Sequence, residues 1–179
     1  MTRIVVFVGS LRAESINRNY ASLLEALLPE GVAFDFVNLQ LPLFNEELET
    51  NFPAEAQAMK DQLSGADGVL FFTPEYNRSF PGVLKNAIDW ASRPNGTNSF
   101  DAMPAAILGV SGSLGTAQAQ QQLRNVLLHL NMKLIGQPEM YINKKTTFTD
   151  TKQLTDDAKT FAEAFLSVFL GHVEYNKKQ

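Results

Sequence analysis

The sequence contains no cysteine. This absence excludes disulfide bonds, thiol redox chemistry and metal sites built from thiolates. Histidine is scarce as well, because only His129 and His172 occur, and they lie far apart without a nearby ligand pattern. We therefore expect no metal centre. Neither histidine falls in a predicted strand-end loop, so no Ser/His/Asp arrangement indicates hydrolysis.

The chain also lacks a large excess of charge and any long apolar segment. Its formal net charge is -4 and its pI is about 5.2, which argues against nucleic acid or an anionic membrane as the main partner. No apolar run is long enough to cross a bilayer, and the N-terminus shows no signal-peptide pattern. We therefore expect a cytoplasmic protein in which residues 1–179 form a single domain.

Short apolar runs predict the strands of a sheet. Three of the runs show no alternation of polar and apolar residues, which is typical of parallel strands covered on both faces. One run, Val32–Leu39, does alternate and predicts a strand nearer an edge. The predicted strands are Ile4–Val8, Val32–Leu39, Val69–Thr73, Ala105–Val110 and Met140–Asn143, the last of which could begin nearer Leu134.

Apolar residues at helical spacing predict helices between these strands. The predicted helices are Ile16–Leu28, Ala54–Leu63, Val83–Ala91, Gln118–Leu130 and Phe161–Phe169. Strands that alternate with helices indicate βαβ units with right-handed crossovers, and hence a three-layer α/β domain. In such a sheet, ligands bind beyond the carboxyl ends of the strands, where the strand order reverses.

The first loop at that edge reads "GSLRAESINRN" and covers Gly9 to Asn19. With one glycine and no lysine, it matches neither the dinucleotide fingerprint nor the nucleoside-triphosphate loop. Its polar side chains, together with the N–H groups that open the next helix, suit one terminal monophosphate. These side chains belong to Ser10, Arg12, Ser15 and Asn17. The alternative is that Ser15 only caps the helix and Arg12 is solvated.

Two further loops are expected beside the first. In "TPEYN", Pro74 stiffens the turn, while Glu75, Tyr76 and Asn77 offer backbone amides and an aromatic face to a flat heterocycle. The loop "SGSLG", Ser111–Gly115, allows close backbone approach and supplies further N–H donors. Each loop taken alone could be an ordinary surface turn.

Taken together, these loops resemble the NAD(P)H-dependent FMN reductase family of flavodoxin-like proteins, which includes quinone, azo-dye and chromate reductases. The matching motifs are "GSLRAESINR", "TPEYNRSFPGVLKNAID", "GVSGSLG" and "LPLFNEEL", and the resemblance covers nearly the whole chain. It implies a flavodoxin-like three-layer sandwich with a five-stranded parallel sheet in the order 2-1-3-4-5. FMN would then lie at the switch between strands one and three.

The resemblance also implies roles for individual residues. Ser10, Arg12, Ser15 and Asn17 would hold the FMN phosphate, Pro74, Glu75, Tyr76 and Asn77 would border the isoalloxazine, and Ser111, Gly112 and Gly115 would approach its pyrimidine edge. Family members are usually dimers or tetramers. Leu41–Leu48 and Pro81–Trp90 are therefore candidate segments of a homodimer or homotetramer interface, although both could instead pack within one chain.

The implied activity is hydride transfer from NAD(P)H through flavin N5 to quinone-like, azo or other small acceptors, or to free flavin. It needs no dedicated catalytic side chain, and Tyr76 and Asn77 would lie nearest the flavin. One alternative is a flavodoxin-like FMN electron carrier without NAD(P)H turnover, and another is a flavin-free phosphate-binding module. The preference between NADPH and NADH stays open, because Arg12, Arg78 or Arg93 could meet a 2′-phosphate.

Overall fold

The computed structural model describes residues 1–112 and 115–177. In chain order the elements are β1 (Thr2–Val8), α1 (Ile16–Glu25), β2 (Val32–Phe36), the short 3-10 helix η1 (Glu46–Asn51), α2 (Ala54–Ser64), β3 (Gly68–Phe72), α3 (Gly82–Ala91), β4 (Pro104–Ser111), α4 (Ala117–His129), β5 (Lys133–Leu134), β6 (Met140–Asn143), α5 (Lys144–Thr147) and α6 (Asp156–Lys177).

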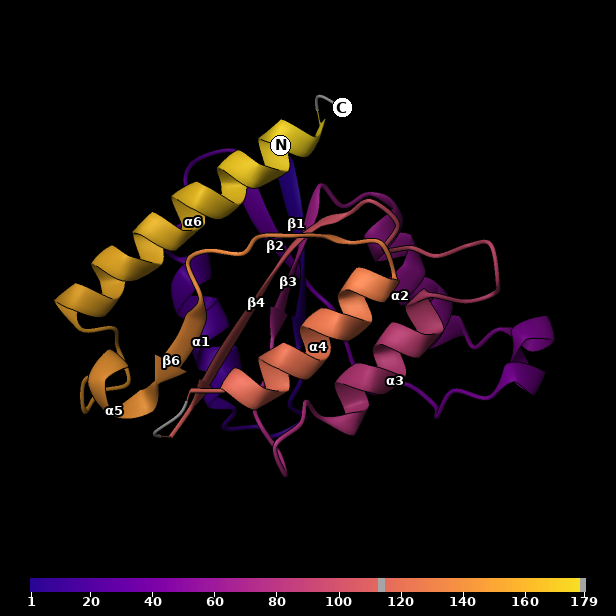
Figure 1. Ribbon diagram of the computed structural model, residues 1–179, viewed down its shortest axis with the longest axis horizontal. Coiled ribbons are helices and arrows are strands. Elements are labelled where there is room, and N and C mark those ends of the chain that lie inside the picture. The colour runs from indigo at the N-terminus through magenta and orange to yellow at the C-terminus, as the bar shows by residue number, and fades with distance from the viewer. Residues whose placement is uncertain (113–114, 178–179) are drawn as a thin grey trace.

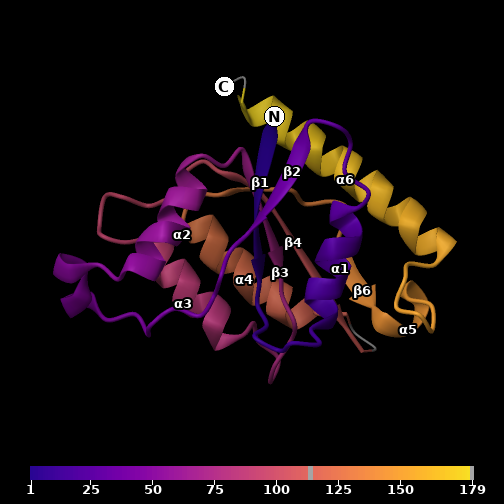
Figure 2. The ribbon, with the colours of Figure 1, turned by 180° about the vertical axis from the view of Figure 1, so that it is seen from behind.

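The strands form one parallel sheet in the order β2-β1-β3-β4-β5, with β6 also paired to β4. Helices α1 and α6 cover one face of the sheet, and α2, α3 and α4 cover the other (Figures 1 and 2). The predicted flavodoxin-like three-layer fold and its strand order are therefore confirmed. Because β1 lies between β2 and β3, the strand order reverses between β1 and β3.

The predicted fifth strand is divided into two short pieces. Strand β5 pairs with the start of β4, and β6 pairs with its end, in the register Leu108 to Met140 and Ser111 to Asn143. Pro138 lies between the pieces and has no N–H group to donate to a ladder. The expectation of a single fifth strand is corrected in this respect.

Burial explains why the central strands lack alternation. Along β1, Val5 and Phe7 belong to the apolar cluster under α2, α3 and α4, whereas Ile4 and Val6 belong to the cluster under α1 and α6. All four side chains are fully buried. Strand β2 lies at the sheet edge, as its alternation predicted, and it buries only its middle residue.

Two short helices and part of a third were not predicted. Helix η1 and helix α5 are short and polar, and each begins at an asparagine whose side chain accepts a backbone N–H bond. Helix α6 extends well beyond the predicted Phe161–Phe169 in both directions. Its last turn is held by Lys177, whose Nζ lies 3.1 Å from Oδ1 of Asp67 in the turn before β3.

None of the helices in the described ranges, 1–112 and 115–177, is both long enough and apolar enough to span a membrane.

Candidate functional site

Three loops converge where the carboxyl ends of β1, β3 and β4 meet, at the lower edge of Figure 1. Backbone bonds tie the starts of these loops together: Gly9 N donates to Phe72 O over 2.8 Å, and Thr73 N donates to Leu108 O over 2.8 Å. Pro74 of the second loop and Leu84 of α3 both pack close to Gly9 of the first loop. A Cβ atom on Gly9 would lie 3.4 Å from Cδ of Pro74.

The first loop presents a cation with no carboxylate bound to it. The Arg12 side chain is exposed, and its guanidinium makes no hydrogen bond or ion pair with the rest of the described chain. The loop's own acid, Glu14, lies 3.0 Å from Nζ of Lys152. The hydrogen bond and charge of Lys152 lower the pKa of Glu14. The charge of Arg12 also lowers the pKa of Glu14, but Lys152 is the group that bonds this carboxylate, so the Arg12 guanidinium keeps its N–H donors for an anion.

Ser15 caps helix α1, as the alternative interpretation of this residue held. Its Oγ accepts a bond from Arg18 N over 3.3 Å, and its hydroxyl proton remains a donor. The backbone N–H groups that open a helix have no partner within it, and they favour an anion at this position. Ser10 lies nearby, and its Oγ is 3.4 Å from the backbone nitrogen of Arg12.

Asn17 is buried and binds the end of β4. Its Oδ1 accepts a bond from Val110 N over 2.8 Å, and its Nδ2 donates to Val110 O over 3.1 Å. This pair of bonds fixes the first loop against the strand that leads to the third loop. One Nδ2 hydrogen is left for a further acceptor.

The second loop is a tight hairpin with an unusual backbone. Tyr76 N donates to Ser79 O over 2.9 Å, and Ser79 N donates to Tyr76 O over 3.0 Å. The two residues between them have positive φ angles, 51° at Asn77 and 65° at Arg78, as in a type I′ turn. Asparagine tolerates this conformation, but it is uncommon for arginine. Surrounding contacts must therefore hold the turn in place.

Helix α4 provides those contacts. Oε2 of Glu75 accepts bonds from Gln118 N over 3.0 Å and from Ala119 N over 3.1 Å, at the start of α4. The N-cap residue of α4, Thr116, makes no side-chain cap bond, so Glu75 takes that place. One turn further on, Gln122 donates to Arg78 O over 2.8 Å and accepts from Ser79 Oγ over 2.7 Å.

The third loop begins at Ser111, the last residue of β4, and its middle residues, Ser113 and Leu114, lie outside the described ranges. Gly112 faces open space. Gly115 has a φ of +60°, and a Cβ atom there would lie 2.8 Å from the backbone of Tyr141 in β6. Glycine is therefore required at position 115 by both its backbone conformation and its close contact.

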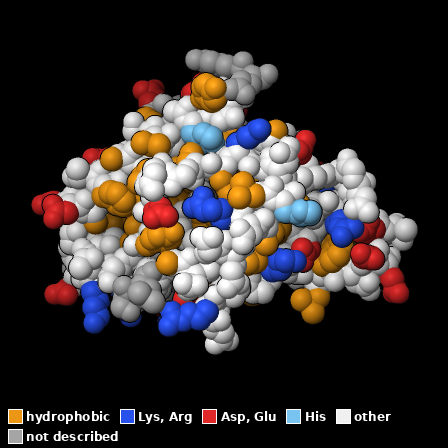
Figure 3. Space-filling view, in the orientation of Figure 1, with side chains coloured by type: hydrophobic (Ala, Val, Ile, Leu, Met, Phe, Trp, Pro, Cys, Tyr) orange, Lys and Arg blue, Asp and Glu red, His pale blue; other side chains and the backbone are white. Residues whose placement is uncertain are grey.

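The first and second loops line an open depression of about 530 Å³. The depression is lined by Gly9, Ser10, Leu11, Arg12, Tyr76, Pro81, Gly82 and Val83. Leu11 and Tyr76 are about half exposed there, at 53% and 52%. Lys and Arg side chains project from this lower edge of the molecule (Figure 3). The site thus combines an exposed guanidinium and polar side chains with an open, partly apolar surface.

The structure separates the predicted site residues into two groups. Ser10, Arg12 and Tyr76 line the shared depression. Asn77, which follows Tyr76 in the hairpin, is exposed. The side chains of Asn17 and Glu75 instead hold the loops together. Their contacts add a structural role to the predicted ligand contacts, which stay predictions.

Sequence analysis missed two residues that shape the site. Gln122 holds the hairpin, but a glutamine in a helix carries no signal of that role. Gly109 lies within β4, and a Cβ atom there would lie 1.9 Å from Thr116 Oγ1 and 2.3 Å from Thr73 O. A lone glycine inside an apolar strand does signal such a close approach. Within the described ranges, no group of three or more potential metal ligands occurs.

Comparisons with known proteins identify the chain's relatives. The family model for NADPH-dependent FMN reductase matches residues 2–147. A 2-hydroxy-1,4-benzoquinone reductase of a Burkholderia species is 44% identical over 175 residues, which cover 96% of each chain. A quinone reductase of Pseudomonas putida is 40% identical over 178 residues, covering 97% of this chain and 96% of the relative.

A solved structure agrees with these sequence relatives. FerB, a flavoenzyme NAD(P)H:(acceptor) oxidoreductase from Paracoccus denitrificans, superposes with a TM-score of 0.92 at 37% identity, covering 98% of this chain and 99% of FerB. The family match covers most of the chain, and the relatives match almost end to end. This chain therefore belongs to the NADPH-dependent FMN reductase family, and it is an oxidoreductase that uses FMN with NAD(P)H as co-substrate.

Proposed function

We propose that this chain passes reducing equivalents from NAD(P)H, through FMN, to small quinone-like acceptors. The observation that carries the proposal is that Ser10–Arg12, which bears an exposed guanidinium, lines an open depression together with Tyr76. Two of its relatives are named as quinone reductases, one of them for 2-hydroxy-1,4-benzoquinone. Azo compounds and free flavin are the other acceptors to which such an open site gives access.

The residues of the first loop fit the phosphate of FMN. Arg12 offers a guanidinium that no carboxylate of the described chain occupies, and Ser15 offers a hydroxyl donor at the start of α1. We infer that Ser10 and the first N–H groups of α1 complete the cradle. Asn17 fixes the cradle to β4 and contributes its remaining Nδ2 hydrogen.

The second and third loops fit the isoalloxazine. Tyr76 lies half exposed on a hairpin that Gln122 of α4 holds by hydrogen bonds, and Pro74, two residues earlier, packs close to Gly9 of the first loop. The backbone N–H group at Gly112 is the donor that we assign to the pyrimidine edge, since the Gly115 N–H group already donates to Gly112 O over 3.4 Å and Gly115 serves through its close backbone approach. Donors fixed in this way stabilise negative charge without reorganising. A ring held there would keep one face open.

The chemistry of electron transfer belongs to bound FMN, which accepts a hydride equivalent and returns electrons to an acceptor. The chain's own residues bind and orient the reactants. The depression is open, so the nicotinamide and the acceptor can occupy the same space in turn. No described side chain has to act as a nucleophile, which agrees with the lack of cysteine.

Steady-state kinetics test this proposal. The two reactants should give parallel lines in double-reciprocal plots, because the nicotinamide must leave before the acceptor enters. Quinones, an azo dye and free FMN should be compared at equal concentration, and we expect the quinones to give the highest kcat/KM. Intersecting lines, or no turnover with any quinone, would contradict the proposal.

We also propose that the chain forms a homodimer or homotetramer through Leu41–Leu48. This segment extends beyond α3 in Figure 1 and exposes 83% of Leu43. It is held firmly, because Pro42 O accepts bonds from Trp90 Nε1 over 2.8 Å and from Asn86 Nδ2 over 2.9 Å. Leu43 lines an open depression together with other apolar side chains, among them Leu41 and Val83, and an exposed apolar patch of this kind is typical of an interface.

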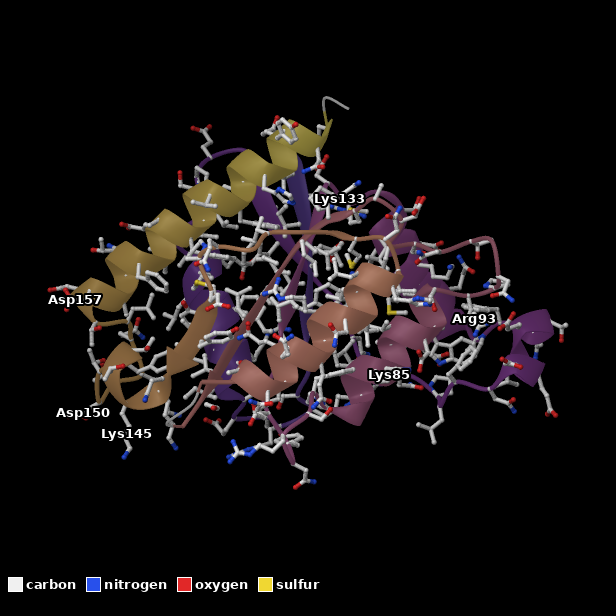
Figure 4. The ribbon with its side chains drawn as sticks, in the orientation of Figure 1. Lys85, Arg93, Lys133, Lys145, Asp150 and Asp157 are labelled. Atoms are coloured by element: carbon white, nitrogen blue, oxygen red, sulfur yellow. The ribbon has the colours of Figure 1, made fainter. Side chains whose placement is uncertain are left out.

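The sequence left open whether the α3 residues belong to a subunit interface or pack within one chain. Trp90 is fully buried and packs within the chain, whereas Lys85 and Asp89 remain partly exposed beside an α3–α4 groove. Figure 4 shows Lys85 and Arg93 on this side of the molecule. Light scattering on the wild type and on Leu43→Glu tests the interface. We expect the variant to dissociate toward monomers, and an unchanged mass would contradict the assignment.

A further inference from the structure

A second depression borders the candidate flavin site on the side of β2. It measures about 400 Å³ and is lined by Val8, Ser10, Leu11, Arg12, Arg18, Phe36, Val37, Asn38, Leu39 and Gln40. It shares Ser10, Leu11 and Arg12 with the depression that contains Tyr76, so the two adjoin at these residues. A ligand that lies over one of them can therefore extend into the other.

The charge of this depression has one sign. The described residues that line it include two arginines and no carboxylate. Glu14 stands between the two arginines in the sequence, but Lys152 binds it at 3.0 Å. Arg18 makes no side-chain hydrogen bond or ion pair within ranges 1–112 and 115–177. Because Arg12 is assigned to the FMN phosphate, Arg18 is the positive group left in this depression for a second anion such as a phosphate monoester.

The depression is also shaped to hold one arginine in a fixed orientation. The guanidinium carbon of Arg18 lies 3.7 Å from the centroid of the Phe36 ring. Stacking of this kind occupies the flat face of the guanidinium and leaves its edge N–H donors free. Helix α1 supplies Arg18, and the neighbouring edge strand β2 supplies Phe36 (Figure 2).

Amide side chains complete the donor set. Asn38 follows the end of β2, and its Oδ1 accepts a bond from Gln40 N over 3.0 Å. Its Nδ2 group is left to donate. An acidic residue at this position would repel a phosphate and favour a ribose hydroxyl instead, whereas amides and arginines favour the phosphate.

The other arginines that the sequence suggested for a 2′-phosphate already have acidic partners. NH1 of Arg78 lies 3.4 Å from Glu75 Oε1. The guanidinium of Arg93 lies 3.9 Å from Glu46 and 3.7 Å from Glu49. Their charges are therefore partly neutralised within the chain, unlike those of Arg12 and Arg18.

We propose that the depression between α1 and the end of β2 binds the 2′-phosphate of NADPH, and that Arg18 determines the preference for NADPH over NADH. The inference rests on the proposed function, because the nicotinamide must lie over the flavin site for the adenosine end to reach this depression. Arg12 lies at the boundary of the two depressions and is assigned to the FMN phosphate. Arg18 does not line the depression that contains Tyr76.

The test compares Arg18→Gln, Arg18→Lys and the control Lys133→Gln in the FMN-loaded protein. Lys133 lies at the opposite end of the sheet, where β5 pairs with the start of β4 (Figure 4), and its replacement removes the same charge. Calorimetry with adenosine 2′,5′-bisphosphate and adenosine 5′-monophosphate measures binding without turnover. Steady-state kinetics then give kcat and KM for NADPH and for NADH.

We expect wild type to bind the 2′,5′-bisphosphate more tightly than the 5′-monophosphate. Arg18→Gln should weaken bisphosphate binding about fivefold to tenfold, as expected for one charge-assisted contact in an exposed site. It should raise KM for NADPH to the same degree and leave KM for NADH and both kcat values unchanged. Arg18→Lys should restore part of the loss, Lys133→Gln should match wild type, and added salt should reduce the difference.

Three results would overturn the proposal: equal wild-type affinity for the two adenosine ligands, equal effects of Arg18→Gln on NADPH and NADH, or an effect of Lys133→Gln as large as that of Arg18→Gln. None of them would affect the proposed function, which is tested separately by turnover of the FMN-loaded protein with either nicotinamide and a quinone.

Discussion

Replacing Asn17 by alanine separates the structural role of this residue from a role in binding phosphate. Its side chain makes two buried hydrogen bonds to the backbone of Val110, and both residues are about 1% exposed. Alanine would leave the Val110 N–H group buried without this partner. One such unsatisfied group costs about 1–3 kcal/mol, and the lost packing adds to it. We expect Asn17→Ala to lower the free energy of unfolding by about 3 kcal/mol.

Urea unfolding, followed by circular dichroism with and without saturating FMN, measures this loss. The Val110 contact exists without a ligand, so the loss should already be present in FMN-free protein. Asn19→Ala is the matched control, because Asn19 donates a single exposed bond to Lys152 O over 3.1 Å. That control should lose less than about 1 kcal/mol. An Asn17→Ala variant that is as stable as wild type without FMN would refute the structural role.

Three further variants test other contacts. Gly109→Ala should fail to accumulate as folded protein, because its Cβ atom would lie 1.9 Å from Thr116 Oγ1; soluble expression at wild-type level would contradict this. Glu75→Gln should lower the free energy of unfolding by about 1–2 kcal/mol, because α4 loses a charged cap. An unchanged free energy of unfolding would be evidence against the cap. Burial opposes ionisation of Asp67, but bonds from the Arg3 N–H group and Lys177 outweigh it and lower its pKa below 3.8. The stability that ionised Asp67 adds is therefore present above about pH 4 and lost below it. On acidification, the thermal midpoint of Asp67→Asn should fall less than that of wild type. Parallel plots of the two midpoints against pH would contradict this linkage.

Local patterns were enough to predict the sheet. Runs such as Ile4–Val8 are apolar on every residue because both faces of β1 are covered, and that pattern is written in the sequence itself. The strand order came from the resemblance of the loops and not from the runs. The division of the fifth strand was missed, although Pro138 stands in the sequence between its two parts.

The site was predicted as a set of loops, but not as a set of contacts. Polar residues after buried strands indicated where a ligand would bind, and the structure brings Ser10, Arg12 and Tyr76 to one depression. No local pattern could reveal that Asn17 binds Val110, 93 positions away, because such a contact depends on the packing of α1 against β4. Arg18 escaped notice for the same reason, since its partner Phe36 comes from another element.

Anaerobic reduction tests the central claim most directly. The purified protein is loaded with FMN, freed of excess flavin, and mixed without oxygen first with NADPH or NADH and then with a benzoquinone. We predict rapid loss of the visible flavin absorbance on adding the nicotinamide, and its return when the quinone is added. A protein that keeps its bound FMN oxidised in the presence of either nicotinamide would instead be an electron carrier, and one that takes up no FMN would contradict the account altogether.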